Sequence, residues 1–98
     1  MVSLAEYKAA YAGFYARMTR VKNLASALKD GRYGFHATSF RLDIKKYMSQ
    51  IEKVYQLYTT APSYKNKDFT DYVKKLEADV SYMEERLKKE TAISNAQR

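Results

Sequence analysis

The chain has 98 residues, of which 46% are hydrophobic and 30% charged, and its formal net charge at neutral pH is +7. This length and composition indicate one folded domain over residues 1–98 rather than a disordered segment. Because cysteine is absent, disulfides and thiolate metal sites are excluded. No apolar run reaches the ~18 residues of a membrane-spanning helix, and no secretory signal opens the sequence, so we expect a protein of the cytoplasm or of a host cell's interior.

The first predicted helix spans residues 4–29. Ser3 and Glu6 form the pattern of a capping box at its start. Its apolar residues recur at alternating spacings of three and four, which places them on one face of a helix. These residues are Leu4, Tyr7, Tyr11, Phe14, Met18, Val21, Ala25 and Leu28. Gly31, directly after Asp30, is expected to end the helix in a left-handed cap.

The second predicted helix spans residues 39–60 and follows a loop over residues 30–38. Thr38 or Ser39 is expected to cap its start. Pro62 ends it, because the residue before a proline is pushed out of the helical region. Its apolar face consists of Phe40, Ile44, Tyr47, Ile51, Val54 and Tyr58.

The third predicted helix spans residues 68–90, with Asp68 or Asn66 as its cap. The same alternation of spacings continues up to Leu87 and then fades, so residues 91–98 are expected to fray. Its apolar face consists of Phe69, Val73, Leu76, Val80, Met83 and Leu87.

Three helices of similar length, each with one apolar face and joined by short loops, indicate an all-α fold. We predict an antiparallel three-helix bundle with heptad apolar faces like those of a coiled coil. The alternative is a long helical hairpin that completes its core by dimerising.

The sequence offers little for catalysis, so we expect no enzyme, no cofactor and no bound metal. His36 is the only histidine, and a metal or nucleophilic site needs further ligands or partners beside it. The seven acidic residues of the third helical region alternate with lysines at i, i+4 spacing, which is typical of a solvated helix face. The expected pairs are Asp71 with Lys75, Lys75 with Asp79, Glu84 with Lys88 and Glu85 with Lys89.

The positive charge is concentrated in the first two-thirds of the chain. Residues 1–67 hold twelve basic and four acidic side chains, whereas residues 68–98 hold six and seven. Lys8, Tyr15, Lys22 and Lys29 share one heptad position and so follow one flank of the first helix. A line of cations with an aromatic ring suits a phosphate backbone. The candidate nucleic-acid-binding residues are Lys8, Tyr15, Arg17, Arg20, Lys22, Lys29, Arg32, Lys45 and Lys46.

Ten tyrosines are an unusual number for this length. Those on the apolar faces are expected in the core. The others are expected on the surface, where tyrosine beside Lys or Arg marks either a protein interface or a site for single-stranded nucleic acid. The second group is Tyr15, Tyr33, Tyr55, Tyr64, Tyr72 and Tyr82.

The outer face of the first helix carries small residues, which would let another helix approach closely. A second copy of the chain could supply that helix. The candidate oligomer interface is Ala5, Ala9, Ala12, Gly13 and Ala16.

These features favour a small, basic, non-enzymatic protein that binds nucleic acid through its first two helices, as a homo-oligomer. The alternative is a protein–protein interaction module, such as an inhibitor, an adaptor or an assembly subunit, that docks on an acidic partner.

Overall fold

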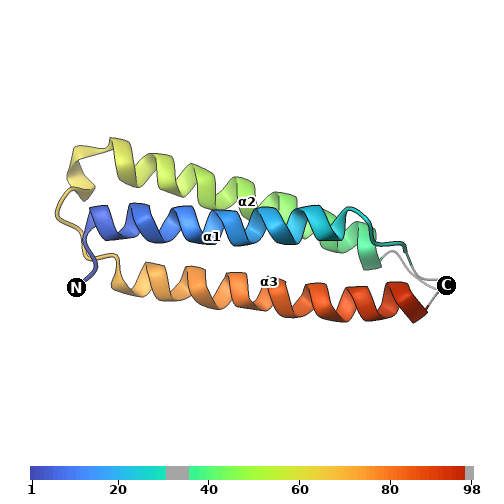
Figure 1. The fold of residues 1–98 in the computed structure, drawn as a ribbon. Coiled ribbons are helices and arrows are strands. Elements are labelled where there is room, and N and C mark those ends of the chain that lie inside the picture. The colour runs from blue at the N-terminus through green and yellow to red at the C-terminus, as the bar shows by residue number, and fades with distance from the viewer. Residues whose placement is uncertain (31–35, 97–98) are drawn as a thin grey trace.

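The computed structural model describes residues 1–30 and 36–96, which form a three-helix bundle (Figure 1). The helices are α1 (Leu4–Ala25), α2 (His36–Thr60) and α3 (Thr70–Ala96), and a 3₁₀ turn, η1 (Pro62–Tyr64), follows α2. The bundle measures 52 × 19 × 17 Å, and the described residues contain no strand. The predicted fold class and the up-down-up arrangement are confirmed.

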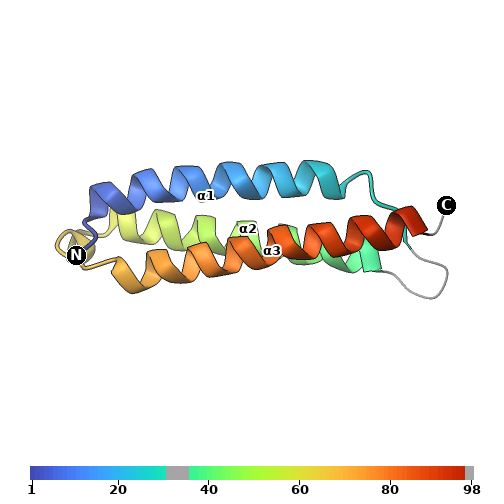
Figure 2. The same ribbon diagram turned by 60° about the horizontal axis from the view of Figure 1, so that its bottom comes forward.

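Helix α1 is the central element, because it packs along both α2 and α3, whereas α2 and α3 touch each other much less (Figure 1). Figure 2 shows the same bundle with α1 above α2 and α3. Helices α1 and α3 run in the same direction and are tied together at both ends. At one end the Phe69 backbone N–H donates to the Val2 carbonyl at 2.9 Å. At the other end the Lys29 backbone N–H donates to the Ser94 hydroxyl at 3.1 Å.

The core consists of the predicted apolar faces with a few changes. Phe14, Ile51 and Leu76 are buried, as their positions in the heptads require. On α2, Met48 is buried in place of Tyr47, whose half-buried hydroxyl donates to Asp79 on α3 at 3.2 Å. The buried apolar residues are Tyr7, Phe14, Met18, Val21, Ala25, Ala37, Phe40, Ile44, Met48, Ile51, Phe69, Leu76, Val80, Met83 and Leu87.

The prediction that the first helix reaches residue 29 is wrong, since α1 ends at Ala25. Beyond it, Leu28 donates to the Ala25 carbonyl at 3.1 Å, a bond three residues long that tightens the chain into a turn. The Arg41 Nη1 of α2 then donates to two carbonyls at this end, Ala25 at 3.3 Å and Leu28 at 2.9 Å. A cation there also offsets the negative end of the helix dipole. The expected cap at Gly31 lies outside the described residues.

Helix α2 begins at His36, three residues before the predicted start. Its first turn is bound by Asp30, which accepts hydrogen bonds from the Thr38 backbone N–H at 2.9 Å and the Thr38 hydroxyl at 2.7 Å. These bonds lower the pKa of Asp30. Thr38 and Ser39, the expected caps, lie inside α2, and Asp30 is the side chain that binds its first turn.

Helix α3 begins two residues later and ends six residues later than predicted. Asp68, one of the two expected caps, accepts from the Thr70 backbone N–H at 3.0 Å and from the Val2 backbone N–H at 3.1 Å. The hydrogen bond from the Thr70 hydroxyl is the main cause, and together these bonds lower the pKa of Asp68 to about 2. The expected fraying is wrong for residues 91–96, because α3 continues to Ala96 and buries Ser94 against the turn that follows α1, and residues 97–98 lie outside the described residues.

An aromatic cluster fills the end of the bundle that holds the N-terminus and η1. Tyr7 is fully buried at its centre and stacks on Phe69 with ring centroids 4.7 Å apart. Tyr55 stacks on Tyr11 at 4.0 Å, and Tyr72 meets Tyr7 edge-on at 5.5 Å. The expectation that Tyr55, Tyr64 and Tyr72 lie on the surface is wrong, since all three are half-buried against this cluster.

Among the expected surface tyrosines, Tyr82 is the one that the structure leaves exposed, at 61%. Tyr33 lies outside the described residues. None of the helices in the described part of the chain combines the length and the apolar character needed to cross a membrane.

Candidate nucleic-acid interface

Two grooves flank the C-terminal half of α1, one on its α2 side and one on its α3 side, because α1 lies between these helices. The α1–α2 groove encloses about 340 Å³. The α1–α3 groove encloses about 590 Å³. The first is lined by Lys22, Ser26, Arg41, Ile44 and Lys45, and the second by Arg20, Ser81, Glu84, Glu85, Leu87, Lys88 and Thr91.

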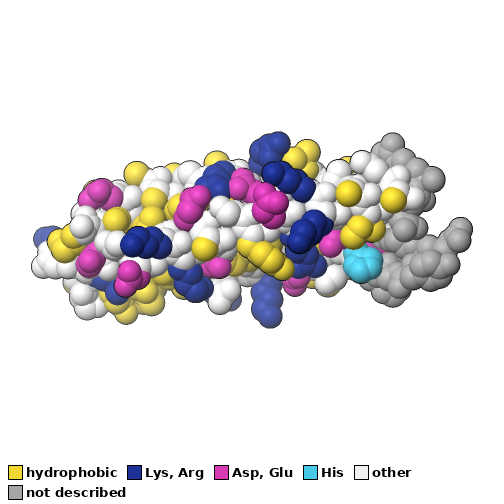
Figure 3. All heavy atoms as spheres, turned by 90° about the horizontal axis from the view of Figure 1, so that it is seen from below, with side chains coloured by type: hydrophobic (Ala, Val, Ile, Leu, Met, Phe, Trp, Pro, Cys, Tyr) yellow, Lys and Arg dark blue, Asp and Glu magenta, His cyan; other side chains and the backbone are white. Residues whose placement is uncertain are grey.

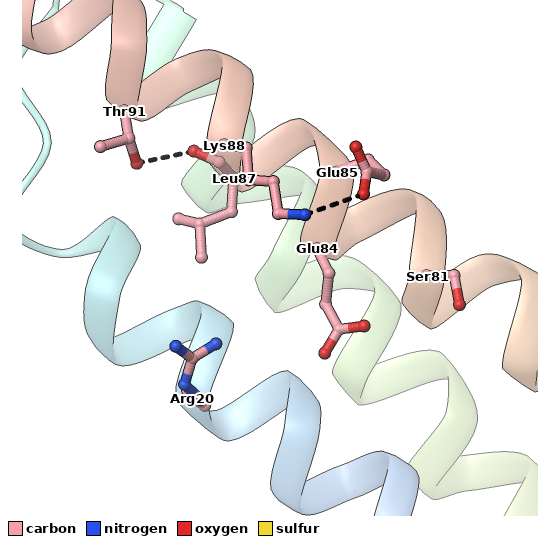
Figure 4. Close-up of a pocket in the computed structure, with 7 residues that line it drawn as sticks. All are labelled: Arg20, Ser81, Glu84, Glu85, Leu87, Lys88 and Thr91. Carbon is pink, nitrogen blue, oxygen red and sulfur yellow. Dashed lines mark hydrogen bonds and ion pairs between the residues drawn. The ribbon is translucent and has the colours of Figure 1, made fainter.

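The α1–α3 groove carries charges of both signs. Figure 4 shows the Glu84 side chain of α3 directed toward α1 and the Arg20 guanidinium of α1 directed into the space below Leu87. Lys88 on its rim bonds to Glu85 at 3.2 Å. Figure 3, which views the molecule from the side of α3, shows basic and acidic side chains interspersed over this face. An anion approaching from this side meets carboxylates as well as cations.

Arg17 is held on the α3 side of α1 by two carboxylates. Its Nη2 lies 2.6 Å from Glu84 Oε1 and its Nη1 lies 2.9 Å from Glu77 Oε2. The hydrogen bond to Glu84 is the main cause that raises the pKa of Arg17, and Arg17 in turn lowers the pKa of Glu84. The expected pair of Glu84 with Lys88 is therefore replaced by a pair of Glu84 with Arg17.

The α1–α2 groove contains no carboxylate among its lining residues. Lys22 from α1 and Lys45 from α2 are exposed, and neither forms an ion pair within the described residues. Arg41 is fixed beside them by its bonds to the end of α1 and by a bond from Nη2 to the Thr38 hydroxyl at 3.2 Å. Three positive charges from two helices thus meet around one groove.

The structure brings together only part of the predicted set. Lys22 and Lys45 line the α1–α2 groove, whereas Arg17 and Arg20 lie on the α3 side of α1. Lys8 shares the heptad position of Lys22 but lies fourteen residues away, about 21 Å along the helix at 1.5 Å per residue.

The remaining predicted residues lie apart from the groove lining. Lys29 and Lys46 are exposed, and neither lines the groove. Tyr15 is half-buried, with its ring 5.7 Å from that of Tyr11. Arg32 lies outside the described residues.

Sequence reasoning missed Arg41, Ser26 and Ile44 at the groove. The spacing of Arg41 from Lys45 is i, i+4, which places both on one flank of α2 and is a signal that could have found Arg41. Ser26 was assigned to the interior of a helix, whereas it lies just past the end of α1. Ile44 was correctly placed in the core, and its edge forms the floor of the groove.

The five small residues of the expected oligomer interface are all exposed on α1. A Cβ atom added at Gly13 would meet no other atom within 4 Å. Packing inside the described part of the chain therefore does not require glycine at this position.

No group of three or more histidine, aspartate or glutamate side chains that could hold a metal ion occurs in residues 1–30 and 36–96. His36, coloured cyan in Figure 3, is exposed at the start of α2. Comparison of the chain with protein-family models, with curated proteins and with solved structures finds no match.

Proposed function

We propose that this protein is a non-enzymatic nucleic-acid-binding protein whose contact surface is the α1–α2 side of the bundle. The single observation that carries the proposal is the separation of charge between the two sides of α1. On the α3 side, Glu77 and Glu84 neutralise Arg17. On the α2 side, Lys22 and Lys45 have no carboxylate partner among the described residues and flank the fixed charge of Arg41.

This arrangement suits a phosphate backbone for a physical reason. A polyanion gains affinity when cations displace its condensed counterions, and cations already paired with carboxylates contribute little to that exchange. Lys22 and Lys45 are flexible and exposed, so each can reach a separate phosphate. The side chains of the groove supply charge and shape rather than a pattern of base-reading groups, and we therefore propose binding with little sequence preference.

The alternative, docking on an acidic protein, would use the same cations. It depended largely on exposed tyrosines, and of these Tyr55, Tyr64 and Tyr72 pack into the aromatic cluster instead. We therefore propose nucleic acid as the partner. We also propose an intracellular location, where nucleic acid is present.

We also propose self-association through the outward face of α1. Its support is the run of exposed alanines around Gly13, which leaves room for a second helix to approach closely. Because this face lies apart from the groove lining, a dimer would carry two separate contact surfaces.

The test compares two double substitutions that remove the same charge from opposite sides of α1. Replacing Lys22 and Lys45 with Gln removes two cations from the α1–α2 groove. Replacing Lys88 and Lys89 with Gln removes two from α3, where both side chains are exposed. Binding of a fluorescent oligonucleotide is measured by anisotropy over a series of salt concentrations.

With three phosphate contacts, log affinity of the unaltered protein is expected to fall against log salt with a slope of about −2 to −3. The Lys22 and Lys45 substitutions should reduce the slope by about two and weaken binding strongly, while the Lys88 and Lys89 substitutions should change little. Equal losses from both variants would show attraction by net charge alone. An absence of binding at ~0.15 M salt, the physiological strength, would favour the acidic-protein alternative.

A further inference from the structure

The α1–α2 groove has an apolar floor beneath its cationic rim. Ile44 lies at its base, 1% exposed, and Lys22 and Lys45 line it above, where lysine side chains offer methylene stems as well as charge. Its volume of about 340 Å³ lies at the small end of the range for ligand pockets, roughly 300–1,000 Å³. At ~30 Å³ per liquid water this space equals about ten water molecules, so a phosphate group alone would leave most of it unfilled.

The end of α1 lies beside this groove, and an unpaired helix C-terminus would repel an anion. Arg41 removes that obstacle, because its guanidinium covers the carbonyls of Ala25 and Leu28 and supplies a positive charge at the same place. The same bonds hold Arg41 in one position. The groove therefore offers an anion one fixed cation and two mobile ones.

A duplex and a single strand would use this surface differently. In a duplex the bases are stacked inside, and the phosphates on its outer surface need only exposed lysines. An apolar floor below the lysines is filled only by a strand whose sugars and bases are free to turn outward.

We infer that the α1–α2 groove seats one nucleotide of a single-stranded nucleic acid. The phosphate lies between Lys22 and Lys45, and the sugar or base packs against the alkyl stems of the lining lysines above Ile44. This inference rests on the proposed function, and it adds that single strands are preferred over duplexes because of the groove's shape and floor.

The first test fills the groove without changing any charge. Ser26 is an exposed lining residue whose hydroxyl bonds only to the Asn23 carbonyl, at 2.6 Å, within its own turn. Ser26→Leu is expected to weaken binding of a labelled oligo(dT) about tenfold and to leave binding of a duplex of equal length unchanged. Ser49→Leu, at an exposed position of α2 that does not line the groove, is the matched control and should change neither.

The second test uses the unaltered protein, so it holds even if Ser26→Leu fails to fold. The methyl resonances of Ile44 are followed by NMR during titration with oligo(dT), with the duplex and with thymidine monophosphate. Oligo(dT) should shift them at the lowest concentration, and the duplex should not shift them at saturation.

The outcomes separate the two proposals. If replacing Lys22 and Lys45 with Gln leaves oligo(dT) binding unchanged, the proposed function fails and the groove inference fails with it. If those substitutions weaken binding but duplex and single strand bind equally and Ile44 does not respond, only the groove inference is overturned. Thymidine monophosphate binding as tightly as oligo(dT) would also overturn it, since the site would then recognise a free nucleotide rather than a strand.

Discussion

The substitution Tyr7→Phe should stabilise this protein, although it removes an atom from the centre of the core. Tyr7 is fully buried, and its hydroxyl makes no hydrogen bond of standard geometry with a described residue, although the Tyr72 side chain lies close enough to act on it. Burial raises the pKa of Tyr7, and the neighbouring Tyr72 adds to that effect. A buried hydroxyl without a partner costs roughly 1–3 kcal/mol relative to the hydrated unfolded chain.

The expected gain is smaller than that cost, because removing the oxygen leaves a small void. Cavities in cores cost about 24 cal/mol per Å³, and a single oxygen leaves little volume. We therefore expect the free energy of unfolding to rise by ~1 kcal/mol, which corresponds to a rise in Tm of about 4–8 °C for a domain of this size. The stacked contact of Tyr7 with Phe69 is retained by phenylalanine.

Tyr47→Phe is the matched comparison, because it removes the same atom from a hydroxyl that has a partner. Tyr47 donates to the Asp79 carboxylate at 3.2 Å. Asp79 is partly exposed and water can replace the lost bond, so we expect a loss of ~1 kcal/mol. Urea unfolding followed by circular dichroism at neutral pH should thus separate the two variants by ~2 kcal/mol. If Tyr7→Phe were the more destabilised variant, the assignment of an unpaired hydroxyl at Tyr7 would be wrong.

Four further outcomes follow from the contacts of single residues. Leu76→Ala should cost ~2–5 kcal/mol of unfolding free energy in the same urea assay, because Leu76 is 2% exposed in the core. In acid, the bonds that lower the pKa of Asp68 to about 2 stabilise the fold above pH ~4 and are lost between pH ~4 and ~2. Asp68→Ala should therefore flatten this part of the stability profile measured by urea unfolding. Burial is the main cause that raises the pKa of Tyr11 to about 12. The folded protein therefore keeps a proton on Tyr11 that the unfolded chain releases near pH ~10, so the free energy of unfolding should fall above that pH while tyrosinate absorbance rises. Gly13→Leu should not change the helical circular-dichroism spectrum, but light scattering should report the mass of a monomer for the variant and of a dimer for the unaltered protein. If the unaltered protein is monomeric at high micromolar concentration, the proposed self-association is wrong.

The fold could be predicted from the sequence because the apolar spacing alone decides which face of each helix is buried. Phe14, Ile51 and Leu76 occupy that face whatever the neighbouring helices are. The helix ends could not be predicted, since they depend on partners that are distant in the chain. Arg41 meets the end of α1 from another helix, and Asp30 binds Thr38 from eight residues away.

The candidate site could be predicted only in part for a related reason. The heptad places Lys22 and Arg17 on opposite flanks of the first helix, and the structure confirms this separation. Which flank meets an acidic neighbour depends on the handedness of the bundle, which the periodicity of a single helix does not contain. The prediction that Tyr55, Tyr64 and Tyr72 are exposed was wrong because an aromatic ring next to an apolar face can pack over its edge, as Tyr55 does on Tyr11.

The proposed binding surface depends less on the number of cations in the chain than on where the carboxylates are placed. By sequence, the third helix is nearly neutral and could be expected to have no electrostatic effect. In the structure, Glu77 and Glu84 are directed at α1 and neutralise Arg17 on one of its flanks. Asp43 of α2 points away from the α1–α2 groove and pairs with Arg86 of α3. One acidic side chain of α2 is thus paired with α3, and Lys22 and Lys45, where α1 meets α2, keep no carboxylate partner among the described residues.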